Sequence, residues 1–381
     1  MRIAYPTLFD ALDVNQAWSG IGYFLPRALA DVGCEIQYIG PLETQPTRLA
    51  YRKKWLAEKI EGKRYSFVWD PDVMRNYARQ VSQELESSNA DVVLSVGVIP
   101  VAYLESELPL AIWADATFYL MRDYYPEFKA LPYLNLRAGM KAEKLAQRKV
   151  VASIFSSDWA AESAQRDFGV SHDCIHVVPF GANMATAPDR ESVKQSVQKR
   201  DLNKCSLLAV GVSWERKGFD VALDVTKALN DSGHRTHLTI IGCELPPSAC
   251  QSDYVTSLGR LDKSRASDLE KLHQAFCDAT FFILPTIADC TPIVLNEANS
   301  FGLPCLTTRT GGISTIIRSG VNGFLFESGD VDEYVGTIIR LLEDRIAYIA
   351  LAESSLEEYH SRLNWRRSAE SVRQILEKVT T

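Results

Sequence analysis

The stretch IADCTPIVLNEANSFGLP, residues 287–304, carries two carboxylates, Asp289 and Glu297, on either side of a Thr-Pro step. A strand-like run, TFFILP, precedes it. We expect Thr291 to cap a helix of about three turns, with Pro292 in its first helical position. The first amides of such a helix carry a partial positive charge that suits a phosphate group. This stretch is therefore a candidate anion site.

Glu297 lies four residues from both Ile293 and Phe301, so it shares their apolar face on the predicted helix. Burying an unpaired carboxylate costs several kcal/mol, which means that Glu297 needs a partner. A pair of ligand hydroxyls suits its two acceptor oxygens. The alternative is an Arg or Lys of its own domain.

Two adjacent cations, Arg216 and Lys217, lie in LLAVGVSWERKGFDVALDV, residues 207–225, which is typical of a strand, a loop and a helix. Basic residues at a helix start are unfavourable to the helix dipole unless an anion is present. Arg offers a fork of donors and Lys a compact charge, so the pair suits a diphosphate leaving group. Taken alone, the pair is also compatible with a solvated loop.

The first third of the chain has two further candidates. Gly20 and Gly22, in WSGIGYFLPRALADVG (18–33), open a predicted helix and would let backbone amides approach a ligand, although a plain turn fits equally well. The match to the nicotinamide fingerprint is weak, because the third glycine is missing. Asp115 follows the strand-like LAIWA and is either a helix cap or an active-site acid.

No metal or other cofactor is indicated. Two Asp-x-Asp triplets, at 70–72 and 330–332, could hold a metal-bound sugar nucleotide, but both precede predicted helices and are interpreted as caps. The six histidines form no H-E-x-x-H motif or other ligand set.

Short apolar runs alternate with longer amphipathic segments, as in α/β proteins with parallel sheets, and the order repeats in the second half. Each half therefore predicts a Rossmann-like domain, and ligands of such sheets bind beyond the carboxyl ends of the strands. The expected strands are 2–5, 35–39, 91–96, 110–114, 151–155 and 175–178, then 206–212, 237–242, 256–259, 280–284, 304–308 and 323–326.

A polar stretch without a clear strand, residues 179–201, is interpreted as the linker. We place the first domain at 1–182 and the second at 183–363, followed by a C-terminal helix at about 364–381.

Composition narrows the class further. The chain has 381 residues, 46% hydrophobic, enough for two domains, and its net charge of −7 argues against a nucleic-acid binder. Eight scattered cysteines without a C-x-x-C pair are typical of a reducing compartment. No signal-peptide pattern and no span-length apolar run is visible, so we expect a cytoplasmic protein, at most peripheral on the inner membrane face.

Together these stretches resemble the retaining GT-B glycosyltransferases of glycosyltransferase family 4. The resemblance covers nearly the whole chain and implies two Rossmann-like domains with parallel sheets facing across a cleft. Its motifs are SGIG (19–22), the run 154–183, RKG (216–218), LGRL (258–261), the acid-x7-acid block from Asp289 to Glu297, GLP (302–304), GG (311–312) and NGFLF (322–326).

The resemblance also implies roles. Glu297 would hold the nucleotide ribose, Asp289 the transferred sugar, and the backbone near Arg260 and Leu261 the base. The diphosphate would bind the side chains of Arg216 and Lys217. It would also bind the backbone amides of Thr291 and Ile293, on either side of Pro292, and the turn at Gly20 and Gly22. The C-terminal helix would return to the first domain. Asp289, Arg216, Lys217 and Asp115 would be the catalytic set.

Several positions depart from the family pattern. Many members have Glu where Asp289 stands, Arg where Val212 stands, Glu where Thr315 stands, and His near Asp115. Because Asp is one methylene shorter than Glu, the identity of the donor sugar stays open.

The implied reaction is transfer of a hexose from a UDP or GDP sugar to a hydroxyl of a glycan or lipid-linked acceptor, without a metal. A GT-B epimerase or phosphorylase and a non-catalytic sugar-nucleotide sensor are the alternatives, because fold alone does not settle function. Residues 48–67 hold seven basic and two acidic residues among aromatic ones. This mix suits an anionic membrane surface, and a solvated helix face is the simpler interpretation.

Overall fold

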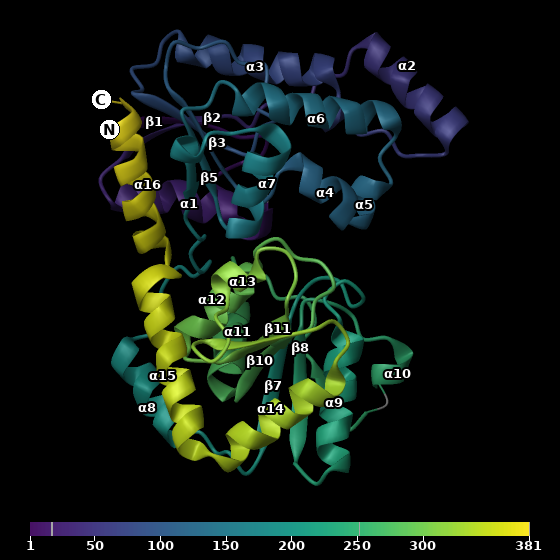
Figure 1. The fold of residues 1–381 in the computed structure, drawn as a ribbon, viewed down its shortest axis with the longest axis vertical. Helices are drawn as coiled ribbons and strands as arrows, with labels where there is room; N and C mark the ends of the chain where they lie inside the picture. The colour runs from purple at the N-terminus through teal and green to yellow at the C-terminus, as the bar shows by residue number, and fades with distance from the viewer. Residues whose placement is uncertain (17, 251, 381) are drawn as a thin grey trace. The chain divides into compact units, whose positions relative to one another are not determined.

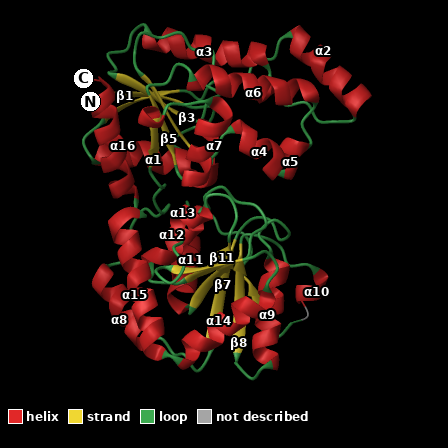
Figure 2. Ribbon diagram, viewed as in Figure 1, coloured by secondary structure: helices red, strands yellow, loops and turns green. Residues whose placement is uncertain are grey.

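The computed structural model describes residues 1–16, 18–250 and 252–380 and divides the chain into two compact units. The first unit comprises Met1–Pro179 and Trp365–Thr381, and the second comprises Phe180–Asn364 (Figure 1). Each unit contains a six-stranded sheet flanked by helices (Figure 2).

The sheet of the first unit is entirely parallel and has the order β2-β1-β3-β4-β5-β6. The strand order reverses at β1, so the crevice between the loops after β1 and β3 is a topological switch point. Its strands are β1 (Arg2–Pro6), β2 (Glu35–Ile39), β3 (Val92–Val96), β4 (Leu110–Ala114), β5 (Ala152–Phe155) and β6 (Ile175–Val177).

The first unit's helices pack on both faces of this sheet. Residues of α3 (Pro71–Leu85) and α6 (Tyr133–Gln147) share one buried cluster with β1, β3 and β4. On α16, the ring of Trp365 lies 5.9 Å from that of Trp113, and α16 also packs along α1. The helices are η1 (Trp18–Gly20), α1 (Ile21–Asp31), α2 (Arg48–Leu56), η2 (Ala57–Glu61), η3 (Phe67–Trp69), α3 (Pro71–Leu85), α4 (Phe118–Tyr124), α5 (Pro126–Lys129), α6 (Tyr133–Gln147), α7 (Asp158–Phe168), η4 (His172–Cys174) and α16 (Trp365–Thr380).

The sheet of the second unit is also parallel, in the order β12-β11-β10-β7-β8-β9. Its order reverses between β7 and β10. The strands are β7 (Cys205–Val210), β8 (Thr236–Ile241), β9 (Val255–Ser257), β10 (Phe281–Leu284), β11 (Cys305–Thr308) and β12 (Gly323–Phe326). All twelve strands predicted from the sequence are confirmed, to within two residues at either end.

The linker predicted at 179–201 is not an open connection, because it contains helix α8 (Arg190–Lys199). Asp189 caps this helix by accepting a hydrogen bond from the Ser192 amide at 2.9 Å, and Val193 and Val197 are buried in the second unit's core. The other helices of this unit are α9 (Phe219–Asp231), α10 (Pro247–Cys250), α11 (Ala266–Asp278), α12 (Ile293–Ser300), α13 (Ile313–Ile316), α14 (Val331–Glu343) and α15 (Arg345–Arg362), and α8 spans Arg190–Lys199.

Three of the inner strands are buried on both sides. Every residue of β4, β10 and β11 is buried, as expected for parallel strands covered by helices on both faces. Among the described residues, no helix combines the length and the apolar character that a membrane span needs. All eight cysteines lie in the described ranges, and none forms a disulfide.

Candidate functional site

The loops after β7 and β10 meet at the switch point of the second unit's sheet. Gly218 has a φ of +67°, and a Cβ there would lie 1.9 Å from the carbonyl oxygen of Pro285. Only glycine fits this approach without a shift of the backbone. The Thr286 hydroxyl and the Ile287 amide both donate to the carbonyl oxygen of Arg216, each at 2.9 Å. The two loops are therefore tied together beyond the carboxyl ends of their strands.

A cluster of two cations and one carboxylate lies in these loops. Lys217 Nζ donates to Asp289 Oδ2 at 2.6 Å, and Arg216 Nη1 lies 3.3 Å from Asp289 Oδ1. The Lys217 and Asp289 side chains are 9% and 11% exposed, and that of Arg216 is 26% exposed. The solvated-loop interpretation is therefore wrong for Lys217. One carboxylate faces two cations, which leaves the cluster with a net charge of +1.

Helix α12 begins directly after this cluster. It is shorter than predicted, and its N-cap residue is Pro292, in an extended conformation and without a side-chain cap. The predicted cap at Thr291 is wrong, because the helix starts at Ile293, one residue later than the cap requires. Thr291, Pro292 and Ile293 are all buried. The Leu295 amide donates to the carbonyl oxygen of Pro292 at 3.1 Å. The start of a helix carries a partial positive charge, so its position beside the cation cluster favours an anion.

Glu297 is 4% exposed on α12 and pairs with a lysine of its own unit. Lys263 Nζ donates to Glu297 Oε1 at 2.5 Å, and the Lys263 side chain is 31% exposed. The own-domain cation, one of the two alternatives from the sequence, is thus the partner in the structure. Sequence reasoning did not single out Lys263, since a contact across 34 residues leaves no local signal.

Lys263 follows β9, in the same loop as two other predicted site residues. Gly259 turns this loop with a φ of +64°. Arg260 is exposed, whereas Leu261 is half-buried and packs against the core. The loops after β7, β9 and β10 thus bring Arg216, Lys217, Arg260, Leu261, Lys263 and Asp289 to one edge of the sheet.

In the first unit, the predicted glycine turn is a strained helix start. Trp18, Ser19 and Gly20 have φ values of 56°, 55° and 86°, all in the left-handed region. Gly20 is the N-cap of α1. Gly22 is required by packing, because a Cβ there would lie 2.1 Å from the ring of Phe9. Contacts within the unit therefore account for Gly22 without a ligand.

Asp115 follows β4 and is not a helix cap. Thr117 caps α4 instead, accepting a hydrogen bond from the Leu120 amide. Asp115 Oδ2 accepts a hydrogen bond from Trp18 Nε1 at 3.1 Å. This bond joins the strained turn after β1 to the loop after β4.

Both Asp-x-Asp triplets contain helix caps, as predicted. Asp70 caps α3 and accepts from the Asp72 amide at 2.8 Å, and Asp330 caps α14 and accepts from the Glu333 amide at 3.1 Å. Within the described ranges, no group of three or more His, Cys, Asp or Glu side chains is arranged to hold a metal ion.

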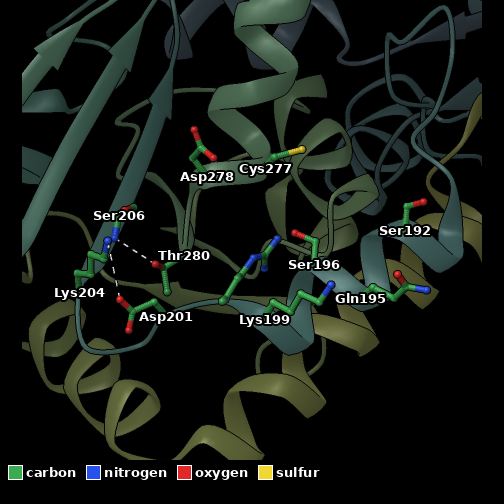
Figure 3. A pocket seen from close by; sticks show the side chains of 11 residues that line it. Ser192, Gln195, Ser196, Lys199, Asp201, Lys204, Ser206, Cys277, Asp278 and Thr280 are labelled. Carbon is green, nitrogen blue, oxygen red and sulfur yellow. Dashed lines mark hydrogen bonds and ion pairs between the residues drawn. The ribbon is translucent and has the colours of Figure 1, made fainter.

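A pocket in the second unit lies at the opposite edge of its sheet (Figure 3). Lys204 Nζ lies 3.8 Å from Asp201 Oδ2, and the Ser206 amide donates to Thr280 Oγ1 at 3.1 Å. Figure 3 marks both contacts with dashed lines. These residues flank the starts of β7 and β10, whereas ligands of open α/β sheets bind at the carboxyl ends. The lining residues are Ser192, Gln195, Ser196, Lys199, Arg200, Asp201, Lys204, Ser206, Cys277, Asp278 and Thr280.

Solved structures of glycosyltransferases share this architecture over the whole chain. Sucrose-phosphate synthase from Thermosynechococcus elongatus aligns with 99% of this chain and 98% of its own, at a TM-score of 0.71 and 15% identity. HepE of Anabaena, solved with UDP and glucose, aligns with 99% of each chain at a TM-score of 0.63 and 16% identity. The protein therefore has the GT-B fold.

The sequence comparisons identify the second unit. Residues 204–344 match the family Glycosyl transferases group 1, so the second unit carries a domain of this family. A curated relative, the UDP-Gal:alpha-D-GlcNAc-diphosphoundecaprenol alpha-1,3-galactosyltransferase of Escherichia coli, is 31% identical over 184 residues. That match covers 46% of this chain and 47% of the relative. The chain thus spans about half the length of this relative.

Proposed function

We propose that the chain transfers a hexose from a nucleotide-diphosphate sugar to an acceptor hydroxyl, with retention of anomeric configuration, in the biosynthesis of a glycan, glycolipid or polysaccharide. The observation that supports this proposal best is the cluster of Arg216, Lys217 and Asp289 beside the start of α12. The Escherichia coli relative is named for a UDP-galactose donor and a lipid-linked acceptor, which agrees with a sugar nucleotide as donor.

In this proposal, the donor exchanges partners with the ion pairs of the site. Its phosphates bind Arg216, Lys217 and the first amides of α12, and Asp289 turns toward the hydroxyls of the sugar. The ribose hydroxyls donate hydrogen bonds to the Glu297 carboxylate and replace Lys263 there. The backbone near Arg260 and Leu261 contacts the base.

The reaction breaks the bond between the anomeric carbon and the phosphate oxygen and forms a bond from the acceptor oxygen on the same face of the ring. The proton of the acceptor hydroxyl passes to the departing phosphate. Catalysis then depends on placement and on stabilisation of the leaving diphosphate by Arg216 and Lys217. These cations and the helix amides neutralise the developing charge, so no metal is required. In this proposal Asp115 is one of the catalytic residues, and the turn at Gly20 and Gly22 contacts the diphosphate.

The first experiment is a thermal-shift panel with UDP, GDP, ADP and their sugars, followed by hydrolysis of the best-binding donor and transfer to acceptors. Lys217→Ala should cost about 2–4 kcal/mol in the barrier, which is about 30-fold to 1,000-fold in turnover. Lys204→Ala, in the exposed pair with Asp201 at the other edge of the sheet, is the control and should keep normal turnover. Near-normal turnover by a folded Lys217→Ala variant would refute the assignment.

The same panel separates the alternatives. An epimerase converts the donor sugar without any acceptor, and a phosphorylase cleaves a glycan with inorganic phosphate. A non-catalytic sensor binds the donor and yields neither transfer nor slow hydrolysis.

A further inference from the structure

The segment formed by α2 and η2 exposes an unusual number of large apolar side chains. Of the fifteen such side chains that are exposed in the described residues, five lie between residues 49 and 60. They are Leu49 (53% exposed), Tyr51 (55%), Trp55 (60%), Leu56 (43%) and Ile60 (76%). Clustered exposed apolar groups mark interaction sites more often than scattered ones do.

The segment touches its own unit through a narrow stripe. Ala50 and Ala57 are buried and lie seven residues apart, which places them on one side of a helix. Arg48, Arg52 and Lys59 are exposed and alternate along the chain with the exposed apolar residues. The solvent side of the segment therefore presents basic and apolar side chains together.

Two other lysines of the segment serve the fold. Lys53 Nζ lies 2.9 Å from Asp70 and 3.3 Å from Asp72, which fixes α2 to the start of α3. Lys54 lies 3.8 Å from Glu58 and over the ring of Phe67. Reversing these charges would disturb the unit itself, so they cannot report on a surface contact.

The three surface cations have no such role. Among the residues that the structure describes, Arg48, Arg52 and Lys59 form no ion pair. Residues 48–64 contain seven basic and two acidic side chains, a net charge of +5, in a chain whose net charge is −7. This local charge is opposite in sign to that of the whole chain, and it attracts an anionic surface.

The exposed apolar surface continues onto α6. The Tyr133 amide donates to Glu61 Oε2 at 3.0 Å, so the start of α6 lies against the end of η2. Tyr133 and Leu134 are 62% and 41% exposed. An aromatic residue thus extends the same surface from a second helix.

We propose that this surface docks on an anionic lipid bilayer. The docking surface, called here the α2 face, consists of Arg48, Arg52, Trp55, Leu56, Lys59 and Ile60. Interfacial helices combine basic side chains, which attract anionic headgroups, with Trp and aliphatic side chains, which enter the boundary of the acyl chains. The buried core of a protein interface is depleted of charge, which makes a protein partner a poorer fit. The proposal concerns a surface separate from the donor site, so either can fail without the other.

The test is co-sedimentation of the full chain with vesicles. One set contains phosphatidylcholine alone, and the other contains equal parts of phosphatidylcholine and phosphatidylglycerol. We expect binding to the anionic vesicles that weakens as salt rises. Each basic residue near such a surface contributes about fivefold, so Arg48→Ala/Arg52→Ala/Lys59→Ala should weaken binding about a hundredfold.

A matched control removes three exposed charges elsewhere in the same unit. Arg79→Ala/Lys141→Ala/Arg148→Ala makes the same change in net charge on α3, within α6 and at the C-cap of α6, and it should bind like wild type. Trp55→Ala/Ile60→Ala should weaken binding while leaving the charge unchanged, and unchanged thermal unfolding shows that each variant folds.

Three results would overturn the proposal. One is wild-type protein that stays in the supernatant with anionic vesicles. Another is equal loss of binding in the control and in the α2-face variant. The last is concentration-dependent self-association that disappears in Trp55→Ala/Ile60→Ala, which would make the α2 face an interface between copies of the chain.

Discussion

Replacing Asp289 by Asn should destabilise the second unit more than replacing its partner Lys217 by Met. Both side chains are about nine-tenths buried, so neither charge can recover its lost partner from water. The two changes differ in what they leave behind. Lys217→Met leaves Asp289 with Arg216 at 3.3 Å and the Thr286 hydroxyl at 3.2 Å. Asp289→Asn leaves two neighbouring cations without a carboxylate.

The structure sets the expected size of each effect. An uncompensated buried charge costs about 3–5 kcal/mol, which is the expectation for Asp289→Asn. Lys217→Met removes one charged hydrogen bond while others remain, at a cost of about 1–3 kcal/mol. For a domain of this size, a difference of about 2 kcal/mol corresponds to a midpoint about 4–8 °C lower for Asp289→Asn. The double variant has no unpaired charge of this pair and should be more stable than Asp289→Asn alone.

Thermal and urea unfolding of the wild type, the two single variants and the double variant form a complete cycle. UDP adds a second measurement, since its phosphates would supply the negative charge that Asp289→Asn removes. We therefore expect UDP to raise the midpoint of Asp289→Asn by more than it raises that of wild type. The reasoning is refuted if Lys217→Met is the less stable single variant, or if the two costs simply add in the double variant.

Three further predictions concern buried groups and a tight turn. Burial raises the pKa of Glu143 to about 7, so between about pH 4.5 and 7 the folded state holds a proton that the unfolded state has lost, and the free energy of unfolding falls as pH rises. In urea unfolding, the drop in this free energy from pH 5 to pH 8 should be about 2–3 kcal/mol smaller for Glu143→Gln than for wild type. Equal drops would contradict this. Gly218→Ala should cost more than about 2 kcal/mol by thermal unfolding, whereas Gly233→Ala, at a similar positive φ with nothing within 4 Å, should cost about 1 kcal/mol. Glu297→Gln should weaken UDP binding about tenfold or more by calorimetry, and a lower melting midpoint with unchanged UDP affinity would mean that the pair with Lys263 is purely structural.

The fold could be predicted from the sequence because its signal is local. Strands buried on both faces, such as LAIWA and TFFIL, are continuous apolar runs between polar segments, and these were identified in both halves. Helix α8 was missed because only Val193 and Val197 mark its apolar face among polar neighbours.

The partners within the candidate site could not be predicted. Lys217 meets Asp289 across 72 residues and Lys263 meets Glu297 across 34, and such pairings depend on the order of strands in the sheet. Sequence spacing could place Lys217 and Asp289 in loops at the same edge of the sheet, but it could not show that they bond to each other. For Asp115 the sequence left two alternatives, a helix cap and an active-site acid. The cap alternative fails because Thr117, two positions further on, has the same ability to cap and caps α4 instead.

The pairing of the charges bears on which ligand the site can accept. Arg216, Lys217 and Lys263 carry three positive charges against the two negative charges of Asp289 and Glu297. Asp289 is shared by Lys217 at 2.6 Å and Arg216 at 3.3 Å, and Glu297 pairs with Lys263 at 2.5 Å. A ligand that offers only phosphates would bind Lys217 and leave Asp289 without its closest cation. A ligand that offers only hydroxyls would bind Glu297 and leave Lys263 without its carboxylate. Asp289 would then keep a buried charge with only Arg216 and the Thr286 hydroxyl beside it, at a cost of about 1–3 kcal/mol. Lys263, whose side chain is 31% exposed, would lose less because water reaches it. A sugar nucleotide carries phosphates for the cations and hydroxyls for the carboxylates in one molecule. Because it offers phosphates to Arg216 and Lys217 and hydroxyls to Asp289 and Glu297 at once, a sugar nucleotide should bind the proposed site more tightly than inorganic phosphate or a free nucleoside does.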